Sequence, residues 1–73
     1  MDRTTLQQRL WEAENLLHRE ELNILRQREA VGMLERAGHD ASLARAFLKR
    51  LESRLASDVA DRDRLFKQLA DQH

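Results

Sequence analysis

The sequence predicts an all-α fold, a two-helix antiparallel hairpin. The first observation behind this prediction is that the 73 residues contain no proline, so no position forces a helix to break. The second is that apolar residues recur at three- and four-residue steps along most of the chain, as on one face of a helix. The third is a single interruption of that pattern near the middle, at Gly38-His39-Asp40.

The first expected helix covers residues 3–37 and carries a heptad seam. Its apolar residues repeat at seven-residue spacing, which is typical of a helix that packs lengthwise against another. They are Leu6, Leu10, Ala13, Leu17, Ile24, Val31 and Leu34. At a rise of about 1.5 Å per residue, this helix is roughly 50 Å long.

The turn is expected at residues 38–40. Gly38 can close the first helix in the left-handed conformation, because it has no Cβ to clash. Asp40 can accept hydrogen bonds from the first amides of the next helix. His39 is expected to pack or hydrogen-bond within the turn rather than to bind a metal. A turn this short makes the helices antiparallel neighbours, so that residue i lies roughly opposite residue 78 − i.

The second expected helix covers residues 41–70. Its stripe comprises Ala44, Leu48, Leu51, Leu55, Val59, Arg62, Phe66 and Leu69. The positions 44, 55 and 66 repeat every eleven residues, which predicts a straighter helix than a strict heptad would give.

A polar layer is expected inside the seam. Glu20 and Gln27 occupy core-type positions of the first helix, and Asp58 and Arg62 lie near Glu20 on the second. A buried layer of acid, base and acid fixes helix register, since an unpaired buried charge costs more than a paired one. We favour this structural role over a catalytic use of the carboxylates, because ion-pair networks often perturb side chains without any chemistry.

Several large apolar residues do not fit into a two-helix seam. Trp11, Leu25, Phe47 and Phe66 are those we expect to contact a second subunit or another partner. A lone hairpin of this size holds little core against an ordering cost of about 1.5 kcal/mol per residue. We therefore expect the hairpin to form a homodimeric four-helix bundle, with twofold symmetry as the simplest arrangement.

The charges are unevenly distributed along the hairpin. Residues 26–54, next to the turn, carry seven basic residues and four acidic ones, whereas the rest carries six basic and nine acidic. Two hairpins with their turns at opposite ends would place each basic half beside an acidic half. The alternative is that these are solvated surfaces whose imbalance has little effect.

Composition and motifs exclude several classes of function. Without cysteine the chain can form neither a disulfide nor a metal-thiolate site, and the formal net charge of zero argues against binding of nucleic acid mainly by electrostatics. No glycine-rich phosphate loop, Ser-His-Asp order or HExxH motif is present. We expect no enzyme activity, no cofactor and no metal. The polar start of the chain and the absence of long apolar runs indicate a cytoplasmic protein without a membrane segment.

The sequence thus favours a non-enzymatic protein-interaction or small regulatory module, and two alternatives stay open. One is a nucleic-acid-binding dimer, since the plasmid copy-number regulator Rop is similar in size and expected shape. The basic cluster Arg45, Lys49, Arg50 and Arg54 does not favour it, because these residues spread around the helix. The other is a subunit that completes its fold with a different protein, which would leave apolar surface exposed in the purified chain.

A family resemblance covers residues 27–69. It rests on the runs Gln27-Arg28-Glu29, Leu34-Glu35-Arg36, Gly38-His39-Asp40, Leu51-Glu52 and Asp61-Arg62-Asp63-Arg64-Leu65, with Leu48 and Leu55 between them. This pattern resembles a group of short, uncharacterised proteobacterial helical proteins. The resemblance implies a bacterial origin and supports the position of the turn, and it implies no activity.

Overall fold

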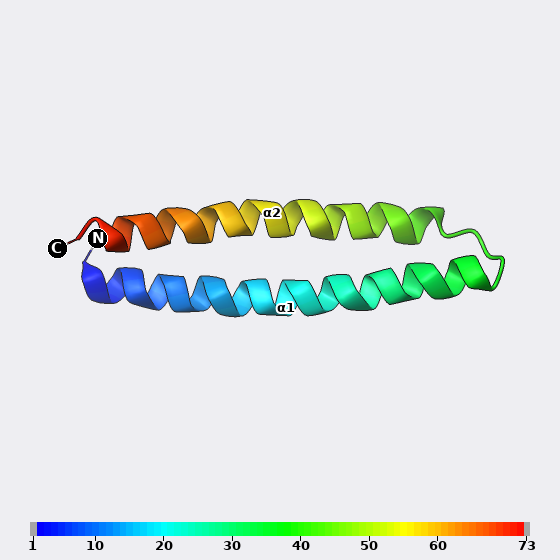
Figure 1. Cartoon of the computed structure of the whole chain (residues 1–73), viewed down its shortest axis with the longest axis horizontal. Coiled ribbons are helices and arrows are strands. Elements are labelled where there is room, and N and C mark those ends of the chain that lie inside the picture. The colour runs from blue at the N-terminus through cyan, green and yellow to red at the C-terminus, as the bar shows by residue number, and fades with distance from the viewer. Residues whose placement is uncertain (1, 73) are drawn as a thin grey trace.

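Two long helices make up the protein, and they lie side by side in opposite directions (Figure 1). The computed structural model describes residues 2–72. Helix α1 spans Arg3–Arg36, and helix α2 spans Ser42–Ala70. The hairpin measures 57 × 15 × 13 Å. The prediction of an all-α helical hairpin is confirmed.

Helix α1 begins at a well-formed cap and buries its heptad seam. The Asp2 carboxylate accepts a hydrogen bond from the Thr5 backbone amide at 2.7 Å, which satisfies one amide that has no partner within the helix. That hydrogen bond also lowers the pKa of Asp2. The side chains buried along α1 repeat at seven-residue spacing from the second onward, and they are Leu6, Leu17, Ile24 and Val31.

The turn is closed by Gly38, the residue in the described chain that has a positive φ, 77°. The His39 amide donates to the Leu34 carbonyl at 2.9 Å, and the Gly38 amide donates to the Glu35 carbonyl at 3.1 Å. These bonds satisfy carbonyl groups at the end of α1. Asp40 then accepts from the Ser42 amide at 2.9 Å, where α2 begins. The expected roles of Gly38 and Asp40 are confirmed, and His39 is exposed.

Helix α2 packs one face against α1 and buries no residue completely. Its half-buried apolar seam includes Leu48, Leu51, Leu55, Leu65 and Leu69. Phe66, which we expected in this stripe, is 59% exposed, and Leu65 takes the inward position instead. The eleven-residue repeat is therefore wrong. The inward positions 51, 58 and 65 are each seven residues apart, so the heptad repeat continues to the end of α2.

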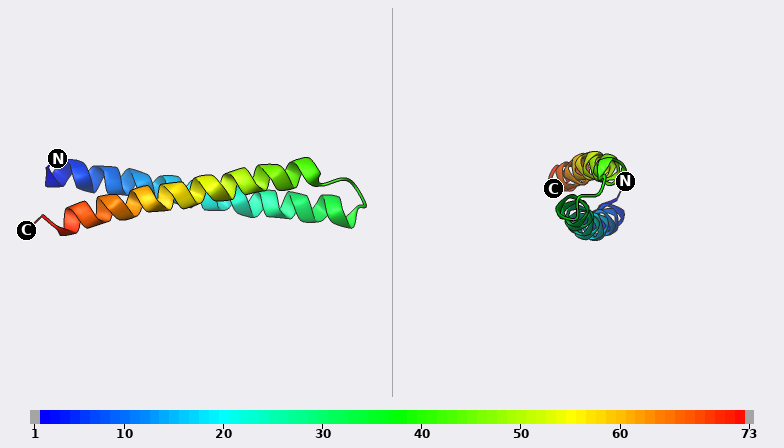
Figure 2. Two further views of the ribbon diagram at one scale, coloured as in Figure 1. Left: turned by 90° about the horizontal axis from the view of Figure 1, so that it is seen from above. Right: turned by 90° about the vertical axis from the view of Figure 1, so that its right-hand side faces the viewer.

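The helices cross gently along their length, as Figure 2 shows. Ile24 and Leu55 line the same shallow cleft between the helices, in agreement with the register expected from the turn position. At the far end the Arg3 guanidinium donates to the Gln72 carbonyl at 3.2 Å, so the two ends of the hairpin lie together. The register is therefore kept from the turn to the termini.

Candidate interaction surfaces

One long side of the hairpin carries two ion pairs that cross from α1 to α2. Arg28 Nη2 lies 3.2 Å from Glu52 Oε2, and Arg45 Nη1 lies 3.0 Å from Glu35 Oε2. Residues seven or fourteen apart share a side of a supercoiled helix. This side, which we call the Trp11 face, therefore comprises Trp11, His18, Leu25, Arg28, Glu35, Arg45, Glu52, Val59 and Phe66.

Large apolar groups of the Trp11 face are exposed. Trp11 is 67% exposed, and Leu25 and Phe66 are each 59% exposed. Leu25 lines a cleft with Glu21 and Arg28, which places it on the side of the crossing ion pairs. By the register of the hairpin, Trp11 and Phe66 lie at nearly the same height, one on each helix. Three of the four apolar residues expected at an interface thus share one side of the molecule.

The fourth, Phe47, lies on the opposite side. Arg54 follows Glu52 by two residues, which is a rotation of about 200° around α2, so the two side chains leave the helix on opposite sides. Arg54 contacts Glu20 from its own side. Phe47 precedes Arg54 by seven residues and therefore shares the side of Arg54. The Phe47 face comprises Arg19, Arg26 and Met33 of α1 and Leu43, Phe47 and Arg50 of α2. The structure therefore does not bring all four expected interface residues together.

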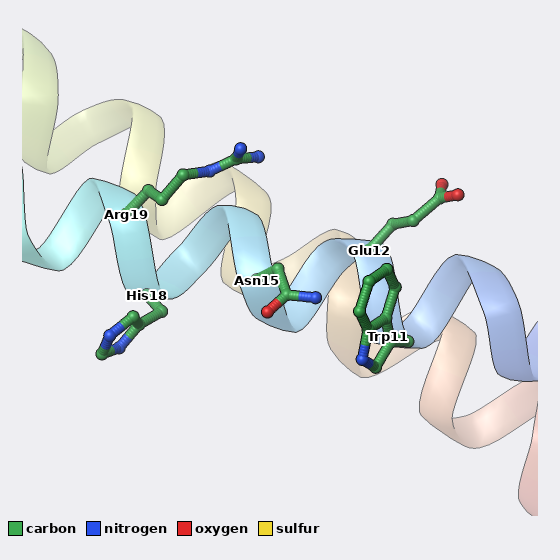
Figure 3. Close-up of a pocket in the computed structure, with 5 residues that line it drawn as sticks. All are labelled: Trp11, Glu12, Asn15, His18 and Arg19. Atoms are coloured by element: carbon green, nitrogen blue, oxygen red, sulfur yellow. The ribbon is translucent and has the colours of Figure 1, made fainter.

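The close-up of α1 separates the two faces directly. Figure 3 shows the Trp11 and His18 side chains projecting from one side of the helix and the Glu12 and Arg19 side chains from the other. With Asn15 these residues line a shallow depression that faces away from α2. Figure 3 thus shows Arg19 projecting on the other side of α1 from Trp11 and His18. Arg26 and Met33 follow Arg19 at seven-residue spacing, which assigns them to the same side as Arg19.

Two carboxyl groups meet inside the seam at Glu20 and Asp58. The Glu20 side chain is only 12% exposed. Both Glu20 oxygens and Oδ2 of Asp58 are shielded from solvent and have no hydrogen-bond donor among residues 2–72. A proton held by one carboxyl supplies the missing donor to the other. The pKa of Glu20 is raised to about 6, mainly by burial of its carboxyl group. The hydrogen bond with Asp58 and the negative charge of Asp58 raise it further.

Arg62 does not supply the base of this layer, which corrects the expected arrangement. The Arg62 guanidinium donates to Asp63 Oδ1 at 3.0 Å, and its side chain is 36% exposed. Arg54 approaches Glu20 instead, with Nε 3.6 Å from Oε1, and this charge lowers the pKa of Glu20 against the larger effects. A long arginine side chain at a seam position can extend past the core and keep its charge in water.

The other polar residue at a core-type position, Gln27, binds the backbone of the opposite helix. Its amide nitrogen donates to the Ala44 carbonyl at 3.0 Å, in a partly buried bond. No group of three or more His, Asp or Glu side chains within residues 2–72 is arranged to hold a metal ion. Within the same residues, neither helix has the length and apolar character needed to cross a membrane. The Trp11 face and the Phe47 face are therefore the surfaces of the described chain that we consider for a functional role.

The chain matches no protein-family model, no curated protein and no solved structure. The resemblance of residues 27–69 to short proteobacterial helical proteins therefore stays a prediction.

The interpretation of the sequence overlooked one exposed apolar residue, Leu43, which is 88% exposed. Its position four residues before Phe47, and therefore on the same side of α2, is the pattern that could have revealed it.

Proposed function

We propose that the protein is a non-enzymatic interaction module of the small regulatory type, which acts as a homodimeric four-helix bundle. The Trp11 face is the subunit interface in this proposal. The observation that supports it most strongly is the exposure of Trp11, Leu25 and Phe66 on one side of the hairpin. Aromatic residues of this size dominate the energetics of protein interfaces when they are buried.

The surface area of the single hairpin supports the same proposal. Its accessible surface is 5741 Å², whereas a compact monomer of this mass exposes about 4,700 Å². The excess is comparable to the roughly 800 Å² that each partner buries in a stable interface. One side of the hairpin, 57 Å long and 15 Å wide between its Cα extents, is large enough to bury that area.

The charge distribution favours turns at opposite ends of the bundle. By the same seven-residue spacing, Glu14, Glu21, Lys49 and Asp63 also belong to the side of the Trp11 face. Its terminal half carries three acids, Glu14, Glu21 and Asp63, against one arginine, Arg3, which lines a depression with Phe66. Its turn half carries Arg28, Arg45 and Lys49 beside two glutamates. In a dimer with its turns at opposite ends, the acidic half of each chain lies beside the basic residues of the other chain. In a dimer with its turns at the same end, residues of like charge lie next to each other.

Light scattering coupled to size exclusion, on the untagged protein over a tenfold dilution, tests the proposal. We expect a mass of twice 8.6 kDa. Combined replacement of Trp11→Ser and Phe66→Ser should shift the mass to that of a monomer, because it removes the two aromatic side chains of the Trp11 face. Leu22→Ser, at a residue that is 40% exposed on the outer side of α1, is the matched control and should leave the dimer intact.

A monomer at every concentration would contradict the proposal and would favour a subunit that completes its fold with a different protein. An unchanged dimer in the Trp11→Ser and Phe66→Ser variant would show that the interface lies elsewhere. Phe47→Ser distinguishes the two faces. It should leave the dimer intact, because Phe47 lies on the side opposite the proposed interface.

A further inference from the structure

The turn half of the Phe47 face combines unpaired basic groups with exposed apolar groups. Arg19, Arg26 and Arg50 form no ion pair with any residue among 2–72. The fourth arginine of this area, Arg54, is held by the shielded carboxyl of Glu20. No acidic residue occupies the outward positions of this half face, which are 19, 23, 26, 30, 33, 37, 43, 47, 50, 54 and 57. The positive charge is therefore not neutralised locally.

The same half of the Trp11 face is arranged differently. There the outward positions carry three basic and two acidic residues, and four of these five are joined in the Arg28–Glu52 and Arg45–Glu35 ion pairs. These pairs bridge the groove between α1 and α2 on that side. On the Phe47 face the corresponding positions hold Ala30 and Phe47. The ion pair that crosses between the helices on this side, Arg54–Glu20, ends on a carboxyl that is only 12% exposed. The two sides of the turn half therefore differ in how many of their exposed charges are paired.

An apolar cluster lies beside these basic residues, toward the turn. Met33 is 59% exposed, Phe47 is 49% exposed and Leu43 is 88% exposed. By the hairpin register these three residues lie at similar heights, with Met33 on α1 and the other two on α2. Ala30 lies one turn from Met33 and leaves room for the backbone of a partner to approach closely.

We propose that this surface binds an amphipathic helical segment of another protein, one whose apolar stripe is bordered by aspartate and glutamate. Met33, Leu43 and Phe47 would receive the apolar stripe, and Arg19, Arg26 and Arg50 would pair with the acidic borders. The distance along α1 from Arg19 to Met33 is about 21 Å, which is the length of roughly four helical turns. A helix that lies in a groove commonly uses anchors over this length.

The apolar cluster favours a protein ligand over a nucleic acid. Arginine binds phosphate well, but nucleic acid offers no aliphatic surface to Met33 and Leu43, and single strands are held by several aromatic side chains rather than one. Phe47 is the only aromatic residue of this face. The surface lies on the side opposite the Trp11 face, so it remains accessible in the proposed dimer and is independent of it.

Fluorescence anisotropy with a labelled synthetic helix tests this inference. The probe is a peptide of about 21 residues with leucine at the first and fourth position of each heptad and mostly glutamate elsewhere. We expect binding that weakens as salt is raised, and at least about tenfold weaker binding of the same peptide with lysine in place of glutamate. A labelled single-stranded RNA serves as the competing class of ligand.

Two basic residues of α2 supply a matched pair of variants. Arg50→Glu on the Phe47 face should weaken binding of the glutamate peptide about tenfold. Lys67→Glu, which makes the same charge change on the outer side of α2, should weaken that binding less than about twofold. Likewise Leu43→Ser should weaken binding and Leu22→Ser should not. Circular dichroism and light scattering confirm that each variant keeps its helices and its oligomeric state.

Three outcomes would overturn the inference. One is the absence of binding to the glutamate peptide at low salt. Another is an equal loss of peptide binding in Arg50→Glu and Lys67→Glu, which would reflect overall charge and not this surface. The third is tighter binding of RNA than of the peptide, with the RNA affinity lost in Arg50→Glu, which would assign the surface to a polyanion backbone.

Discussion

The carboxyl groups of Glu20 and Asp58 face each other in the seam between α1 and α2, where a coiled coil normally packs apolar side chains. Neither group has an arginine within hydrogen-bonding distance, since the nearest charge, Arg54 Nε, lies 3.6 Å from Glu20. Glu20 therefore binds its proton more tightly in the folded hairpin than in the unfolded chain. This makes the hairpin sensitive to pH in the direction opposite to that of most salt-bridged proteins.

The folded hairpin should become more stable as the pH falls from about 7 to about 5. The pKa of Glu20 is raised from 4.5 to about 6 in the folded state, so folding favours the protonated carboxyl. The stabilisation is present below the unfolded pKa and is lost as the pH rises through about 6. Urea unfolding followed by circular dichroism should show a gain of about 1 kcal/mol, after solvent screening is allowed for.

Glu20→Gln should remove this pH dependence and raise stability at neutral pH by about 1 kcal/mol, since the amide is neutral and donates to Asp58. Glu21→Gln, at the neighbouring exposed position, is the control and should leave the pH profile unchanged. A wild-type hairpin that loses stability between neutral pH and about pH 5 would show that the two carboxyls are solvated.

Gly38→Ala should lower the free energy of unfolding by about 1 kcal/mol. The cost comes from the backbone, because φ is +77° and no atom lies within 4 Å of a Cβ built there. Gly32→Ala is the comparison, since Gly32 lies within α1 and a Cβ would approach only the flexible end of Arg36, at 3.0 Å. We expect Gly32→Ala to stabilise by up to about 1 kcal/mol. Similar effects of the two substitutions in thermal unfolding would argue against the left-handed turn.

Arg62→Leu should stabilise the hairpin by about 1 kcal/mol, because it places an apolar side chain at a seam position now occupied by a chain that extends to solvent. Arg64→Leu is the matched control. Arg64 also pairs with a neighbouring aspartate, but its side chain is 69% exposed, so the exchange gains little burial. If Arg62→Leu destabilises the protein in urea unfolding, Arg62 contributes to the acidic layer after all.

The single tryptophan should report assembly through the Trp11 face. Trp11 is 67% exposed in the single hairpin, so its emission should shift to shorter wavelength as rising protein concentration buries it in the dimer. The Phe47→Ser variant should show the same shift at the same concentrations. An emission maximum that does not change across the dilution series in which the mass doubles would place Trp11 outside the interface.

The sequence was sufficient for the hairpin because its strongest signals are local. The seven-residue spacing of Leu17, Ile24 and Val31 and the conformational freedom of Gly38 each act within a few residues. The position of Phe66 was wrong because positions 65 and 66 both carry large apolar residues, and either spacing is helical. Only packing against α1 distinguishes them.

The candidate surfaces were less predictable, because they depend on both helices at once. Arg45, Lys49, Arg50 and Arg54 form one cluster in the sequence, yet the crossing ion pair of Arg45 and the approach of Arg54 to Glu20 assign them to opposite sides. Arg50 gains its basic neighbours from α1, more than twenty residues away. The direction of the Arg62 side chain depends on rotamers that helical periodicity does not determine.

The closeness of Arg3 and Gln72 limits how two copies can be joined into one polypeptide. A linker of about five residues, which reaches roughly 17 Å, would connect neighbouring ends and hold both turns at the same end of the fused protein. Joining copies whose turns lie at opposite ends requires a linker that spans the 57 Å length of the hairpin, or about 17 extended residues. Linker length therefore selects subunit orientation, and a pair of single-chain fusions would show which orientation is the more stable.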